Sequence, residues 1–145
     1  MKFKDLKGYL LAIDLDGTLI QDFDNYDKKS FELLKEFAKN NYVVISTGRP
    51  FRSSQPYYEL LELNTPIANY NGAWVHNPND KNFEKSLITI NRDSLLKFVN
   101  EKKHILHNLF CEIEDDIFSV SFINLGISKL SFCSSRFFRN FCSFF

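Results

Sequence analysis

Short apolar runs alternate with amphipathic segments along the first half of the chain. The first run, residues 9–14, is continuously apolar and ends in an acid, which is typical of a strand buried on both faces of a parallel sheet. Further strands are predicted at residues 42–46 and 67–70, and helices at residues 28–40 and 56–63, the latter with Pro56 near its start. This order indicates right-handed βαβ units and an α/β fold.

The pattern changes after residue 73. Two extended segments flank the turn-rich residues 78–82 and predict a β-hairpin. An apolar stripe predicts a helix over residues 92–109, and alternation over residues 111–122 predicts one more strand or hairpin. We therefore expect an α/β unit at residues 1–73 and the beginning of an inserted α+β unit at residues 74–125.

Residues 126–145 follow neither the helical nor the strand period. This segment is rich in Phe, Ser, Cys and Arg, and it contains few turn residues. One interpretation is a terminal segment that touches a membrane, with Arg136 and Arg139 at the headgroups. The other, which we favour, is that a frame shift or truncation replaced the natural continuation of the gene.

Composition narrows the class of protein. The 145 residues suit a chain of about one domain, given the usual ~100–200 residues per domain. Lys and Arg together number 18, as do Asp and Glu, which argues against a generally basic nucleic-acid binder. No apolar run is long enough to span a bilayer, and the N-terminus makes a poor secretory signal, so we expect a cytoplasmic protein without membrane contact. The three cysteines, Cys111, Cys133 and Cys142, form no CxxC pair and predict no disulfide.

The strongest chemical signal is the run Asp14-Leu15-Asp16-Gly17-Thr18-Leu19 at the end of the first predicted strand. Ligands of open α/β sheets bind at this end of the strands. Gly17 permits a sharp turn there, so that Asp14 can act as nucleophile or metal ligand and Asp16 as general acid. A purely structural strand-to-turn junction is the alternative.

Two further motifs follow the next two predicted strands. Residues 43–50 read VVISTGRP, and Asn71-Gly72-Ala73 follows the third strand. With the first motif, they make residues 8–123 resemble the haloacid dehalogenase-like (HAD) phosphohydrolases of the Cof-type branch, also called type IIB. The resemblance implies an incomplete HAD-like Rossmannoid parallel sheet followed by the beginning of the branch's α+β cap.

The resemblance also implies a role for each matching residue. Asp14 would attack phosphorus and form an aspartyl phosphate, and Asp16 would protonate the leaving group and then activate water. The Asp14 carboxylate and the Asp16 backbone carbonyl would hold Mg²⁺. The implied substrate is a small phosphorylated metabolite such as a sugar phosphate. The residues implied to bind its phosphate or to line the substrate side are Thr47, Gly48, Arg49, Asn71 and Gly72.

Two expected motifs are absent from the sequence. The family has a third-motif Lys and a fourth motif, GDxxND, but Lys129 lies in the anomalous segment and Asp115-Asp116 stands in another context. Two hypotheses therefore remain. The chain is either a Mg²⁺-dependent phosphatase in truncated form or a non-catalytic fragment that at most binds phosphate or a partner.

Three smaller features predict structure rather than chemistry. His104 and His107 are spaced to share a metal on one helix face, but a solvated face is the simpler interpretation. Trp74 is expected to pack within the hairpin, with stacking on a substrate as the alternative. The acids expected in a solvated loop near the site entrance are Asp22, Asp24 and Asp27.

Overall fold

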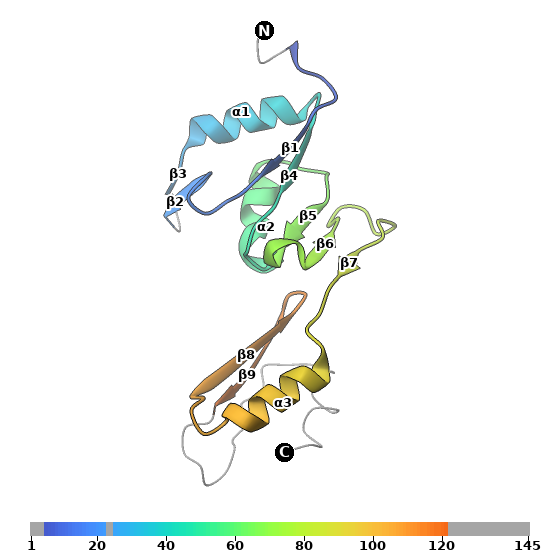
Figure 1. The fold of residues 1–145 in the computed structure, drawn as a ribbon. Coiled ribbons are helices and arrows are strands. Elements are labelled where there is room, and N and C mark those ends of the chain that lie inside the picture. The colour runs from blue at the N-terminus through green and yellow to red at the C-terminus, as the bar shows by residue number, and fades with distance from the viewer. Residues whose placement is uncertain (1–4, 23–24, 122–145) are drawn as a thin grey trace. The chain divides into compact units, whose positions relative to one another are not determined.

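The computed structural model describes residues 5–22 and 25–121, so the segment predicted at 126–145, Cys133 and Cys142 lie outside the described residues. The chain divides into two compact units, residues 1–89 and residues 90–145, and each is described by itself (Figure 1). Within the described ranges, every helix is too short or too polar to cross a membrane.

The first unit is built around three neighbouring strands. β1 (Leu10–Ile13) pairs in parallel with β4 (Tyr42–Ile45), with Leu10 opposite Tyr42 and Ile13 opposite Ile45. A parallel bridge between Ser46 and Ala68 then connects the end of β4 to β5 (Ile67–Asn69). β4 therefore lies between β1 and β5, as the α/β prediction requires, and the three strands present their carboxyl ends at one edge (Figure 1).

The predicted hairpin is confirmed and adds to this sheet. β6 (Trp74–His76) pairs antiparallel with β5, and β7 (Ser86–Leu87) pairs antiparallel with β6. The hairpin thus belongs to the first compact unit, which extends to Thr89.

Two helices connect the parallel strands. α1 (Lys28–Ala38) begins at Asp27, whose carboxylate accepts hydrogen bonds from the backbone N–H groups of Lys29 and Ser30. α2 (Phe51–Leu60) begins five residues before the predicted start, which places Pro56 inside the helix. The sequence pattern missed its first turn because Ser53 and Ser54 are not apolar; both hydroxyls instead donate to the Pro50 carbonyl.

The core of this unit lies on one side of the strands. Its buried side chains come from both helices, the strands and the turn after β1: Leu15, Leu19, Ile20, Phe31, Leu34, Phe37, Val43, Ile45, Tyr58, Leu61, Leu63 and Ile67.

Leu11 and Ile13 of β1 pack against this cluster, whereas Leu10 is 69% exposed and Ala12 is exposed. The prediction that residues 9–14 are buried on both faces is therefore wrong. Successive right-handed crossovers from β1 to β4 to β5 advance in one direction, so both helices cover the same face.

A small hairpin that the sequence pattern did not predict lies between β1 and α1. β2 (Ile20–Asp22) and β3 (Asn25–Tyr26) pair antiparallel with an irregular register. The Tyr26 ring lies 4.6 Å from the Phe31 ring, measured between centroids, which joins the hairpin to the core. Asp27, expected in a solvated loop, is the N-cap of α1.

The second unit contains one helix and one hairpin among its described residues. α3 (Arg92–Lys102) begins at the cap Asn91, and β8 (Asn108–Ile113) pairs antiparallel with β9 (Asp116–Ser121). The predicted helix over residues 92–109 is too long, because the helix ends at Lys102 and the chain enters β8 at Asn108. Cys111 is a free thiol whose pKa is raised by burial.

Candidate active site

The turn after β1 places two acids at the carboxyl end of the strand. Leu15 is fully buried, and its carbonyl accepts hydrogen bonds from the N–H groups of Leu19 and Ile20, both at 2.9 Å. Gly17 has a φ of 73°, a left-handed conformation that glycine adopts without strain. Anchored in this way, the turn leaves the side chains of Asp14 and Asp16 exposed.

Asp16 is held by Arg49 from the end of β4. The Arg49 Nε donates to one carboxylate oxygen at 2.8 Å, and Nη2 donates to the other at 2.5 Å. This two-point ion pair lowers the pKa of Asp16, mainly through the hydrogen bonds from Arg49, and raises the pKa of Arg49. Asp16 is therefore favoured in its carboxylate form.

Residues of α2 hold the Arg49 side chain, although its partner Asp16 is exposed. Its guanidinium carbon lies 5.5 Å from the centre of the Tyr57 ring, and its Nη1 donates to the Ser53 carbonyl at 3.4 Å. Its side chain is only 13% exposed, compared with 57% for Asp16. The sequence predicted that Arg49 lines the substrate side; the structure shows it paired with the expected general acid.

Thr47 occupies the loop between β4 and α2. It is buried, and its N–H donates to the Ala68 carbonyl at 2.9 Å. Its carbonyl accepts from the Asn71 N–H at 2.9 Å, and its hydroxyl oxygen accepts from the Arg49 N–H at 3.2 Å. Thr47 thus ties the loop after β4 to the loop after β5.

The turn over Tyr70–Gly72 has an unusual backbone. Three successive residues have positive φ angles, 51° for Tyr70, 56° for Asn71 and 88° for Gly72. Such angles are rare for a residue with a bulky side chain and cost conformational energy, so tertiary contacts must hold this turn. Gly48 leaves room for the Asn71 side chain, because a Cβ added at Gly48 would lie at a tight 3.3 Å from the Asn71 Oδ1.

The structure thus joins most of the predicted site residues through direct contacts. Asp16 contacts Arg49, and Thr47 bonds to both Arg49 and Asn71. Asp14 lies in the turn after β1 with Asp16, and Gly72 lies in the turn after β5 with Asn71. Both turns lie at the edge of the sheet where the parallel strands β1, β4 and β5 end.

Two residues that contact Arg49 were not predicted from the sequence. Tyr57 lies against the Arg49 guanidinium, and Asn69, which is fully buried, donates to the Arg49 carbonyl at 2.9 Å. The signal for Asn69 was a polar residue ending a short apolar strand. No comparable signal marks Tyr57, which the sequence presents as one more ring in a helix.

The donor chemistry of the turn suits a hard cation. Carboxylate oxygens are preferred Mg²⁺ ligands, and Mg²⁺ in proteins commonly keeps several waters beside one or two carboxylates. Asp14 has an exposed carboxylate, and the Asp16 backbone carbonyl in the same turn is a second oxygen donor, whereas the Asp16 carboxylate is bound by Arg49. Over the described part of the chain, no three His, Cys, Asp or Glu side chains come together to hold a metal, and this includes His104 and His107.

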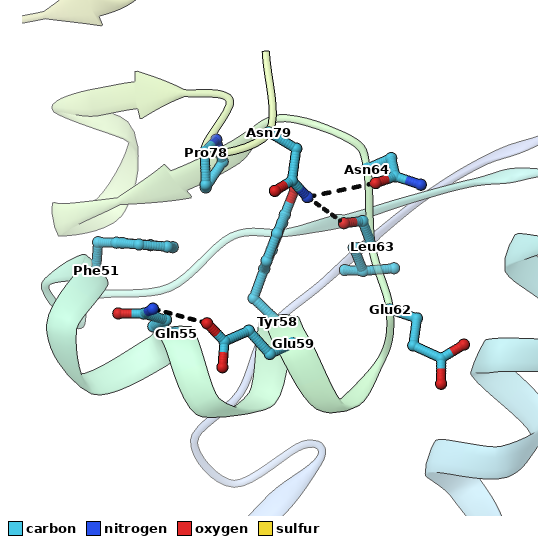
Figure 2. Close-up of a pocket in the computed structure, with 9 residues that line it drawn as sticks. All are labelled: Phe51, Gln55, Tyr58, Glu59, Glu62, Leu63, Asn64, Pro78 and Asn79. Atoms are coloured by element: carbon cyan, nitrogen blue, oxygen red, sulfur yellow. Dashed lines mark hydrogen bonds between the residues drawn. The ribbon is translucent and has the colours of Figure 1, made fainter. Parts of the chain in front are cut away.

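A separate pocket of about 550 Å³ lies along α2. Figure 2 shows Tyr58 at its centre, with Asn79 bonded to Asn64 and to the Leu63 carbonyl. Burial raises the pKa of Tyr58 to about 12. None of the predicted site residues lines this pocket, and its side-chain amides bond to other protein groups, so we assign no chemistry to it.

Comparisons with known proteins connect the chain to one family. A family model for haloacid dehalogenase-like hydrolases matches residues 11–137, which includes the first part of the segment predicted to be anomalous. The 5-amino-6-(5-phospho-D-ribitylamino)uracil phosphatase YitU of Bacillus subtilis is 38% identical over 116 residues, or 79% of this chain and 43% of that protein. The pyridoxal phosphate phosphatase YbhA of Escherichia coli is 30% identical over 103 residues, or 69% of this chain and 37% of that protein.

Solved structures show the same fold. The chain resembles TM0651 from Thermotoga maritima with a TM-score of 0.65 at 22% identity, covering 79% of this chain and 42% of that one. It resembles BT1666 from Bacteroides thetaiotaomicron with a TM-score of 0.62 at 19% identity, covering 79% and 41%. The chain thus spans less than half the length of the relatives it matches.

Proposed function

Because the chain belongs to the haloacid dehalogenase-like hydrolases, as its motifs predicted, we propose that it carries the nucleophile and the general acid–base of a Mg²⁺-dependent phosphatase. One observation carries this proposal. Asp16 is held in place by two hydrogen bonds from Arg49, in the turn that also exposes Asp14. Within the described part of the chain, Arg49 binds Asp16 and not Asp14, and two carboxylates in different environments suit two different tasks.

In the first step, a carboxylate oxygen of Asp14 attacks phosphorus. The bond between phosphorus and the ester oxygen breaks, and the leaving oxygen takes a proton from Asp16. In the second step, water attacks the phosphorus of the aspartyl phosphate and gives its proton to Asp16. The acyl phosphate bond breaks, and Asp14 is regenerated with release of inorganic phosphate.

The Asp16–Arg49 ion pair matches the second step. Arg49 lowers the pKa of Asp16 and so favours the carboxylate, the form that accepts a proton from water. Donation to the leaving group in the first step requires the protonated form. We therefore propose that the guanidinium releases Asp16 when the substrate phosphate, a competing anion, enters the site.

The other predicted residues complete the substrate side. The Thr47 hydroxyl accepts from the Arg49 N–H, which leaves its own hydrogen to donate to a phosphoryl oxygen. Asn71 and Gly72 supply an amide and a tight turn beside it. The Asp14 carboxylate and the Asp16 backbone carbonyl would hold Mg²⁺, which would supply charge neutralisation at the phosphoryl group.

The substrate class follows from the relatives. We propose a small phosphorylated metabolite, because YitU is named for a phosphoribityl compound and YbhA for pyridoxal phosphate. The balance of 18 basic and 18 acidic residues also supports a small substrate rather than nucleic acid.

The test is phosphate release from p-nitrophenyl phosphate, with Mg²⁺ and with EDTA, by a longer protein in which this chain is followed by the third-motif Lys and the GDxxND motif that its sequence lacks. We expect metal-dependent release that disappears in Asp14→Asn, since an amide is a poor nucleophile. Asp16→Asn should slow release by ~10²–10⁴, the range of general acid–base catalysis. Asp93→Asn, which changes a carboxylate with an 89% exposed side chain in the second unit, is the matched control and should leave release unchanged.

Two outcomes would count against the proposal. Full turnover by Asp14→Asn would contradict the assignment of the nucleophile. Mg²⁺-dependent binding of inorganic phosphate without any release would favour the other hypothesis, a non-catalytic phosphate-binding chain.

A further inference from the structure

A buried amide lies directly behind the Arg49 loop. Asn69, the last residue of β5, is fully buried. Its Nδ2 donates to the Arg49 carbonyl at 2.9 Å and to the Ser54 hydroxyl oxygen at 3.0 Å. A buried amide must satisfy its hydrogen bonds within the protein, so this side chain has a defined orientation.

A histidine side chain is the hydrogen-bond partner of the Asn69 amide oxygen. Nε2 of His76 lies 3.1 Å from the Asn69 Oδ1. Because the Asn69 Nδ2 already donates twice, its Oδ1 is the acceptor, and the His76 Nε2 must therefore carry the hydrogen. This contact selects one tautomer of His76 and one orientation of the Asn69 amide.

Ring contacts hold His76 in place. Its ring stacks on Trp74 with 3.8 Å between centroids and 8° between planes. The Phe51 ring meets it edge-on at 4.9 Å. The imidazole is thus fixed between β6 and the first residue of α2, although the proposed reaction does not use it.

These contacts form a continuous path to the expected general acid. His76 donates to Asn69, Asn69 donates to the Arg49 carbonyl, and the Arg49 guanidinium binds Asp16. The Tyr70 N–H adds a second hydrogen bond to the Arg49 carbonyl, at 3.3 Å. The Arg49 main chain is therefore held by the β5–β6 side of the sheet, while its side chain reaches toward β1.

We infer that His76 and Asn69 are positioning residues that hold the Arg49 main chain where its guanidinium can bind Asp16. Neither side chain needs to touch substrate. The link to catalysis rests on the proposed function, but the positioning itself is a property of the protein without substrate.

The test uses the hydrogen on Arg49 Nε, which donates to Asp16. Its exchange with water is measured by NMR on the full chain, and Arg49→Lys identifies the signal. His76→Phe keeps a flat ring for stacking but removes the donor to Asn69. We expect Arg49 Nε–H to exchange about fivefold faster in this variant, the change that loss of one ordinary hydrogen bond produces.

Rescue separates positioning from packing. His76→Gln restores an N–H donor without the ring, and we expect it to recover most of the slow exchange even if its melting temperature falls. Asn69→Ala removes the amide itself and should accelerate exchange at least as much as His76→Phe. His104→Phe, at an exposed histidine of the second unit, should change nothing.

Unchanged exchange in Asn69→Ala, or in a folded His76→Phe protein, would overturn the inference. So would equally fast exchange in His76→Gln and His76→Phe, since this would make the ring and not its N–H group the important feature. No substrate enters these measurements, so their failure is distinguishable from failure of the phosphatase proposal.

Discussion

The two faces of the β1–β4 pair are built from similar apolar side chains but have opposite environments. On the helix-covered face, Val43 is 1% exposed and Ile45 is fully buried, beside Leu11 and Ile13. On the other face, which we call the bare face, Leu10 is 69% and Tyr42 59% exposed. Leu10 and Tyr42 lie opposite each other in the strand register.

This difference arises from the connections between strands and not from the strands themselves. Both crossovers advance from β1 through β4 to β5, and right-handed connections that advance in one direction place their helices on one side. Apolar character therefore does not indicate which face of a strand is covered. The comparison predicts that equal truncations on the two faces have very different costs.

The largest effect is expected on the helix-covered face. Ile45→Ala removes a fully buried side chain from between α1, α2 and the strands, so we expect a loss of about 2–5 kcal/mol in the free energy of unfolding. Urea denaturation measures it. A loss below about 1 kcal/mol would mean that the cluster collapses around the cavity.

A smaller effect is expected from a polar contact within the same layer. The Tyr58 hydroxyl donates to the Thr65 carbonyl at 2.6 Å, so Tyr58→Phe should cost about 1–2 kcal/mol at neutral pH. The raised pKa also predicts a pH dependence. An unfolded tyrosine ionises near pH 10, whereas Tyr58 ionises near 12, so stability is retained below pH 10 and is lost as the pH rises through 12.

Unfolding of both proteins between pH 8 and 12 tests this prediction. Tyr58→Phe should lack the part of the alkaline destabilisation that this hydroxyl causes. Identical pH profiles would show that the hydroxyl ionises as freely in the folded chain as in the unfolded one.

The smallest effect on stability is expected on the bare face. Leu10→Ser changes a side chain that is already mostly exposed, so the free energy of unfolding should stay within about 0.5 kcal/mol of the original. Sedimentation should show less self-association, because exposed apolar strands promote it. A cost as large as that of Ile45→Ala would mean that something covers this face in solution.

Much of the first unit could be predicted because its local signals agree with its packing. Phe31, Leu34 and Phe37 follow the helical period, and all three are buried in α1. Gly17 marked a turn, and it has the positive φ that favours glycine. The acids of that turn could likewise be placed at a strand end from the residues alone.

The errors occur where tertiary contacts decide the outcome. The exposure of Leu10 depends on which side of the strands the helices lie, and the end of α3 depends on Asn108 joining a strand. The spacing of apolar residues within one segment does not predict either outcome. The pairing of Asp16 with Arg49 joins residues 33 positions apart. Sequence reasoning placed both in one site but had no means to detect their ion pair.

Trp74, which stacks on His76, belongs to the first unit, and this makes fluorescence selective for that unit. Trp74 is the chain's one tryptophan, and all six tyrosines also precede residue 90. Fluorescence excited near 280 nm therefore originates wholly in the first unit, whereas far-ultraviolet circular dichroism records helices and strands of both units. Thermal unfolding of one unlabelled sample, followed by both methods, separates the unfolding of the two units, because the second unit gives no fluorescence signal.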